Sequence, residues 1–194
     1  VCVEQINVDF QSTTLAGQFS YALMMSIMGG VVLSFPYIFY QLWAFVKPGL
    51  KGNEKQMAKG IVFYVSLLFF TGILFGYYVV APLSVQFFGA FQITPEIKTD
   101  VTIASYMSTI LSTVFYTGLF FLFPIVTFLL VKIGLFTPEF LIKYRKHAIV
   151  IILILAAVIT PPDVISQVIV TIPIYLLFEI SVLVAKRVDK GEKS

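Results

Sequence analysis

The chain has 194 residues, of which 59% are hydrophobic and 12% are charged, and its mean hydropathy is +0.96. Soluble domains are nearer half apolar and about a quarter charged, so this composition excludes a single aqueous core and indicates a lipid environment. The formal charge of +3 comes from lysines and arginines gathered in loops, which leaves no basic face for nucleic acid. The single cysteine, Cys2, excludes an internal disulfide, and we expect no metal or other cofactor.

Five apolar stretches predict an all-α, polytopic membrane bundle that forms one transmembrane domain over residues 1–194. A spanning helix needs about 20 mostly apolar residues. The predicted spans are residues 15–40, 61–80, 106–130, 148–160 and 164–185. Residues 1–14 are polar and acidic, as is typical of a loop, and we interpret the N-terminus as truncated or processed. Pro36, Pro124 and Pro173 lie inside the spans and predict bends.

The fourth predicted span is short. About thirteen residues make roughly 20 Å of helix, which is less than a hydrocarbon core of about 30 Å. We therefore expect this helix to thin the bilayer locally or to lie sheltered by its neighbours. The run Pro161-Pro162-Asp163 predicts a sharp turn between the last two spans, because proline breaks the helical hydrogen-bond ladder. A single re-entrant element is the alternative.

Basic residues predict the orientation of the chain. All lysines and arginines except Lys98 fall within residues 47–59, 132–146 and 186–193. Basic loops stay on the cytoplasmic side, so we expect these three segments, and the C-terminus, in the cytoplasm. Within the second segment, Thr137-Pro138-Glu139 predicts a helix start, with a capping hydroxyl, a first-turn proline and an acid at the positive dipole end.

Polar residues at membrane depth are few. The sequence offers no serine–histidine pair, metal-ligand set or phosphate-binding glycine loop, so we do not expect an enzyme. Glu179 has two interpretations: pairing with a basic residue near the boundary at Lys186, or a polar contact to a partner or substrate. Gln167 and Asp163 are further candidates for such contacts.

Glu54 lies among lysines in the first basic segment. It could be a solvated loop acid that pairs with Lys51 or Lys55, an arrangement worth about 0–1 kcal/mol. Alternatively, it accepts a cationic ligand arriving from the cytoplasm. A carboxylate takes two parallel hydrogen bonds from one guanidinium, which lysine cannot reproduce.

Four segments, in order, resemble the TatC family, the core receptor subunit of the twin-arginine protein translocase. They are FPYIFYQLWAFVKPGL at residues 35–50, TDVTIASY at 99–106, TPPDVISQ at 160–167 and IPIYLLFEI at 172–180. The resemblance extends over residues 14–187. It implies six spans with both ends cytoplasmic, of which this chain fits spans two to six.

The resemblance also implies site residues. Glu54 falls on the loop glutamate that recognises twin-arginine signal peptides, and Phe45 and Pro48 fall on neighbouring positions of the same site. Asp163 falls on a recurrent acidic position. Leu122 departs from the family, which commonly carries a glutamate or another polar residue there, so a partner contact at that position is not transferred.

The function implied is a receptor in the bacterial inner membrane that binds signal peptides of folded precursors and organises their export. The implied partners are small single-span subunits of the TatA or TatB type in an oligomeric complex, with no cofactor. A small-molecule secondary transporter is the alternative, and it predicts inverted repeats that the five stretches do not show. An intramembrane enzyme is the second rival.

Overall fold

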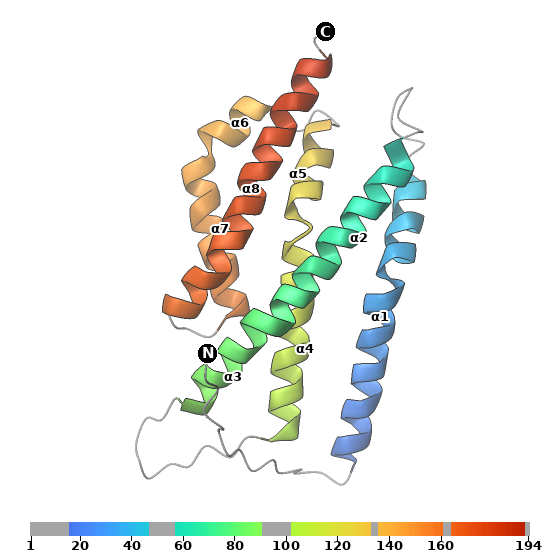
Figure 1. The fold of residues 1–194 in the computed structure, drawn as a ribbon, viewed down its shortest axis with the longest axis vertical. Coiled ribbons are helices and arrows are strands. Elements are labelled where there is room, and N and C mark those ends of the chain that lie inside the picture. Colours follow the sequence, from blue (N-terminus) through green and yellow to red (C-terminus); the bar gives the residue numbers. More distant parts are fainter. Residues whose placement is uncertain (1–15, 47–56, 91–101, 133–135, 161–163, 193–194) are drawn as a thin grey trace.

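The computed structural model describes residues 16–46, 57–90, 102–132, 136–160 and 164–192, and they form helices without a β-strand (Figure 1). The elements, in chain order, are α1 (Gly17–Val46), α2 (Met57–Phe75), the π-helical turn η3 (Gly76–Val80), α3 (Ala81–Ala90), α4 (Ile103–Phe120), α5 (Phe123–Lys132), α6 (Pro138–Lys143), α7 (Arg145–Ile159) and α8 (Val164–Glu192). The predicted all-α fold is confirmed.

The helix ends that border the three basic segments lie at one end of the bundle. The C-terminal ends of α1, α5 and α8, the start of α2 and the whole of α6 gather there, at the top of Figure 1. The start of α1, the end of α3 and the start of α4 lie at the opposite end, whereas the end of α7 and the start of α8 lie short of it. We call the first of these ends the basic end.

Among the described residues, four stretches are long and apolar enough to span a membrane: Gly17–Phe45, Gly60–Phe88, Ile103–Val131 and Val164–Lys186. The chain is therefore a multi-pass membrane protein. The remaining predicted span corresponds to α7, which has 15 residues, so the count of five spans stays a prediction.

The observed helices run past several predicted boundaries. Helix α1 continues through Pro36 to Val46, six residues beyond its predicted end at residue 40. The second span was expected to end at residue 80, but η3 and α3 continue it to Ala90. Pro82 lies directly after the π turn, and π turns and prolines both mark places where a helix departs from its regular hydrogen-bond ladder.

Pro124 interrupts the third span. Helix α4 ends at Phe120 and α5 begins at Phe123, with a tighter turn between them in which Leu122 N–H donates to the Leu119 carbonyl at 3.0 Å. Proline has no N–H for the ladder and its ring displaces the preceding turn. The predicted bend is thus a break between two collinear helices (Figure 1).

Helices α2 and α4 pack at very short range. A Cβ atom on Gly72 would lie 2.9 Å from the Gly118 Cα, and one on Gly76 would lie 2.9 Å from the Val114 Cα. Small residues permit such backbone approach between membrane helices. We call this contact the glycine seam; Thr117, which is fully buried in it, donates its hydroxyl to the Thr113 carbonyl at 2.7 Å.

Candidate functional site

The connection between α1 and α2 carries the strongest sequence-predicted site. Glu54 and Pro48 lie outside the described residues. The structure places the two helix ends that hold this connection in contact at the basic end (Figure 1). Phe45 lies in the last turn of α1, and its side chain is 85% exposed.

Trp43 fixes that helix end. It is 5% exposed and packs with Ile61 and Val65 of α2, and its ring stacks on Phe39 with centroids 6.4 Å apart. Residues two apart on a helix point about 200° from each other. Burial of Trp43 therefore turns Phe45 outward, toward whatever occupies the basic end.

The indole nitrogen of Trp43 has no hydrogen-bond partner among the described residues, although it is buried. An unpaired buried donor costs about 1–3 kcal/mol. The position of Trp43 is thus held by the burial of its ring, not by polar contacts. The sequence analysis included Trp43 in the segment at residues 35–50 but did not predict that its side chain is buried against α2.

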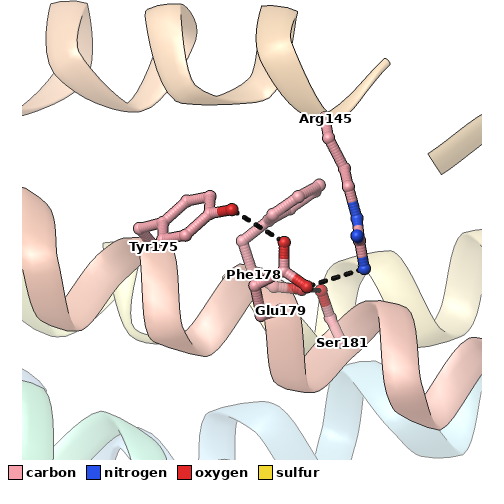
Figure 2. Close-up of polar contacts among 5 residues, drawn as sticks. All are labelled: Arg145, Tyr175, Phe178, Glu179 and Ser181. Carbon is pink, nitrogen blue, oxygen red and sulfur yellow. Dashed lines mark hydrogen bonds and ion pairs between the residues drawn. The ribbon is translucent and has the colours of Figure 1, made fainter. Parts of the chain in front are cut away.

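A second polar cluster joins the start of α7 to α8 (Figure 2). Arg145 Nη2 donates to Glu179 Oε2 at 2.8 Å, and the Tyr175 hydroxyl donates to Glu179 Oε1 at 2.8 Å. Both carboxylate oxygens therefore have a donor. The side chains of Arg145 and Glu179 are 39% and 26% exposed, so the pair lies at the edge of the packed core.

Pairing of Glu179 with a basic residue is thus what the structure shows. The partner is Arg145, 34 positions away, whereas the sequence pointed to the boundary near Lys186. Arg145 is one of only two arginines in the chain, but nothing in the sequence pointed to it as the partner of Glu179. A contact of Glu179 with a partner or substrate stays a prediction.

Gln167 links the same two helices closer to their connection. Its Nε2 donates to the Leu153 carbonyl at 3.1 Å. On the same stretch, the Thr160 hydroxyl donates to the Ala156 carbonyl at 2.8 Å. Asp163 lies outside the described residues, so its contact with a partner stays a prediction.

Leu122 belongs to the apolar cluster around Trp43. It packs there with residues of α1, α2 and α5, against the buried side chains of Ile61 and Val65. In the part of the chain that the structure describes, no group of three or more histidine, cysteine, aspartate or glutamate residues could hold a metal ion.

Comparison with known proteins agrees with this architecture. The family model of TatC, the Sec-independent protein translocase protein, matches residues 2–173. The chain is 40% identical over 184 residues to TatC of Blattabacterium sp. subsp. Periplaneta americana, covering 95% of this chain and 69% of that protein. It is 38% identical over 172 residues to TatC of Helicobacter pylori strain J99, covering 89% and 69%.

A solved structure is similar over most of the chain. It is described as the twin arginine translocase receptor TatC in DDM, and it matches with a TM-score of 0.76 at 34% identity, over 92% of this chain and 79% of that one. These proteins are named as components of a protein translocase. That class differs from both the enzyme and the small-molecule transporter considered as rivals.

Proposed function

Because this chain belongs to the TatC family of Sec-independent protein translocase proteins, we propose that it is the translocase receptor that binds twin-arginine signal peptides at the cytoplasmic face. The observation that carries the proposal is the likeness, at 34% identity over 92% of the chain, to a protein described as a twin arginine translocase receptor. Glu54, Phe45 and Pro48 form the binding site in this proposal.

The described residues supply a platform for that site. The end of α1 and the start of α2, which precede and follow Glu54 in the chain, pack together, and Trp43 anchors them. Phe45 offers an exposed ring in the last turn of α1. A cationic peptide therefore meets an apolar contact and a carboxylate at the same helix ends, and the planar guanidinium gives arginine an advantage over lysine at the carboxylate.

The remaining parts of the proposal follow from the basic segments and the family. Basic loops stay in the cytoplasm, so in this proposal the basic end, Glu54 and the C-terminus face the cytoplasm. The family is the reason for assigning the protein to the bacterial inner membrane. Small single-span Tat subunits join it in an oligomeric complex, and Glu179, Gln167 and Asp163 are candidate contacts with them. The bound precursors cross in the folded state.

The test is peptide binding by the purified protein. We expect Glu54→Gln to weaken binding of a twin-arginine signal peptide roughly tenfold to hundredfold, because a hydrogen bond to a charged group is worth about 1.5–3 kcal/mol. A twin-lysine peptide should bind weakly to both proteins. Fluorescence anisotropy with labelled peptides measures each affinity.

The matched control is Glu139→Gln, which removes an exposed acid from the first turn of α6 at the same basic end. We expect it to leave peptide affinity unchanged. Equal losses from the two substitutions would show a general effect of charge and would remove Glu54 from the site. Equal binding of twin-arginine and twin-lysine peptides by the wild type would overturn the receptor proposal itself.

A further inference from the structure

The corner between α6 and α7 combines basic and aromatic side chains. In Figure 1, α6 lies across the basic end, and the chain turns into α7, which runs along the bundle. Tyr144 makes the turn, with φ −98° and ψ 14°. The predicted helix start is confirmed: the Thr137 hydroxyl accepts from Phe140 N–H at 3.2 Å, and Pro138 follows.

Helix α6 is anchored on one side only. Pro138 and Leu141 are buried against the bundle, whereas Phe140, Ile142 and Lys143 are exposed. A helix that lies across a membrane protein's end with both apolar and basic groups exposed has the character of an interfacial element. An exposed face of this kind suits the headgroup region of a bilayer.

Aromatic rings form a continuous ladder through this corner. The Phe136 and Phe140 rings stack with centroids 5.1 Å apart, Phe140 and Tyr144 lie 4.5 Å apart, and Tyr144 and His147 lie 5.2 Å apart. Lys143 Nζ lies 5.9 Å from the centre of the Tyr144 ring. Aromatic rings with a polar tip favour the membrane–water boundary, so the ladder marks the depth of that boundary.

The two lysines at this corner have no carboxylate partner among the described residues. Lys143 and Lys146 are exposed, and the ion pair of this region, Arg145 with Glu179, uses neither of them. Two ammonium groups beside an aromatic ladder are complementary to a phosphate at the same depth.

An apolar ridge descends from Lys146. Val150, Ile154 and Val158 follow it at intervals of four residues on α7, and all three are exposed. Residues four apart share a helix face, and twelve residues of helix cover about 18 Å. That length is close to one leaflet of a hydrocarbon core about 30 Å thick.

We propose that the α6–α7 corner binds one anionic phospholipid of the leaflet at the basic end. Lys143 and Lys146 hold its phosphate, Phe140 and Tyr144 flank the glycerol region, and an acyl chain lies along the ridge of Val150, Ile154 and Val158. The net charge of the ligand matters because two exposed lysines lie at this corner. This site is separate from the connection between α1 and α2.

The test uses the purified protein in detergent with matched-chain phosphatidylglycerol or phosphatidylcholine, and native mass spectrometry to count bound lipids at low ionic strength. We expect tighter binding of phosphatidylglycerol. Each lysine near an anionic surface contributes roughly a fivefold factor, so Lys143→Gln with Lys146→Gln should lower phosphatidylglycerol affinity about twenty-five-fold and leave phosphatidylcholine binding unchanged.

Three control measurements test the proposal further. Lys143→Arg with Lys146→Arg should retain the preference, since both charges remain. Lys98→Gln, which removes the one basic residue outside the three basic segments, should not change it. Glycerophosphoglycerol, which is the phosphodiester headgroup of phosphatidylglycerol without its acyl chains, should bind far more weakly than the lipid.

Equal binding of the two lipids by the wild type would overturn the proposal. So would an undiminished preference in the Gln variant with its helix content intact by circular dichroism, because the lipid then binds elsewhere. Glycerophosphoglycerol that binds as tightly as the lipid would remove the α7 ridge from the site.

Discussion

The glycine seam and the α7–α8 pair hold helices together in different ways. In the seam, backbones approach so closely that Gly72 and Gly118 leave no room for a Cβ. The α7–α8 pair is instead joined across the helices by the Arg145–Glu179 ion pair and the Gln167–Leu153 hydrogen bond. Lipid offers no hydrophobic gain for helix association, which leaves close packing and polar contacts as the means.

The difference follows helix length. The stretches that form the seam, Gly60–Phe88 and Ile103–Val131, have 29 residues each, and they can pack over many turns. Helix α7 has 15 residues, so it offers fewer turns for packing. One polar contact at its first residue and another farther along compensate for this. We therefore expect larger side chains to destabilise the glycine seam, and the removal of single polar groups to destabilise the α7–α8 pair.

Gly72→Val should have the largest effect. Its side chain would collide with the Gly118 Cα and the Phe121 Cβ, 2.9 and 2.7 Å from an added Cβ, and overpacking of this kind costs about 3 kcal/mol. Detergent-induced unfolding followed by circular dichroism measures the loss. Gly30→Val is the matched control, because nothing lies within 4 Å of a Cβ at Gly30 of α1.

We expect Gly30→Val to leave the unfolding free energy nearly unchanged. The two substitutions share the same change in helix propensity, so their difference reports the close approach alone. Equal losses of unfolding free energy from the two substitutions would show that α2 and α4 do not approach closely in the membrane. The glycine seam would then not be a site of close packing.

Glu179→Gln should have an intermediate effect. The amide can still accept from Tyr175, but it leaves Arg145 without its counter-charge. Breaking a buried pair costs several kcal/mol, and the partial exposure of both side chains lowers that to about 1–2 kcal/mol. The unfolding free energy of the purified protein measures the loss.

A double-mutant cycle with Arg145→Gln isolates the pair. We expect a coupling energy of about 1 kcal/mol, as for residues in direct contact. Additive losses would show that each side chain acts separately, and the ion pair would then play no part in joining α7 to α8.

The sequence predicted the fold better than it predicted these contacts. Long apolar stretches and the Thr137 cap were sufficient for the all-α bundle and for the start of α6. Helix ends were less accurate: α1 runs through Pro36 to Val46, beyond its expected end at residue 40, and the second span runs through Pro82 to Ala90. Proline excludes one hydrogen bond but does not decide whether neighbouring turns continue.

For the candidate site, too, some residues could be predicted from the sequence and others could not. Motif resemblance singled out Glu54, Phe45 and Pro48, because short local patterns carry that information. Contacts between residues far apart in the chain cannot be read from local sequence patterns. Neither the Arg145–Glu179 pair nor the approach of Gly72 to Gly118 follows from the spacing of these residues in the sequence. Both depend on how helices cross, which is a property of the packed bundle.

Gln167→Leu should have the smallest effect, and it tests most directly whether the α7–α8 pair opens independently of the glycine seam. It keeps the volume of the side chain but removes one donor from the Leu153 carbonyl, and such hydrogen bonds in membrane proteins average about 0.6 kcal/mol. Because this contact lies nearer the α7–α8 connection than the Arg145–Glu179 pair, its loss should loosen the pair locally. Amide hydrogen exchange should quicken in α7 while α2 and α4 keep their protection.

The exposed glutamine of α3 provides the control. Gln86→Leu makes the same chemical change at an exposed position and should leave exchange in α7 unchanged. Faster exchange spread evenly over α2, α4 and α7 would mean that the two regions open as one unit. Faster exchange confined to α7 would mean that a short membrane helix can be released while the glycine seam remains closed, because close backbone packing does not depend on any one polar group.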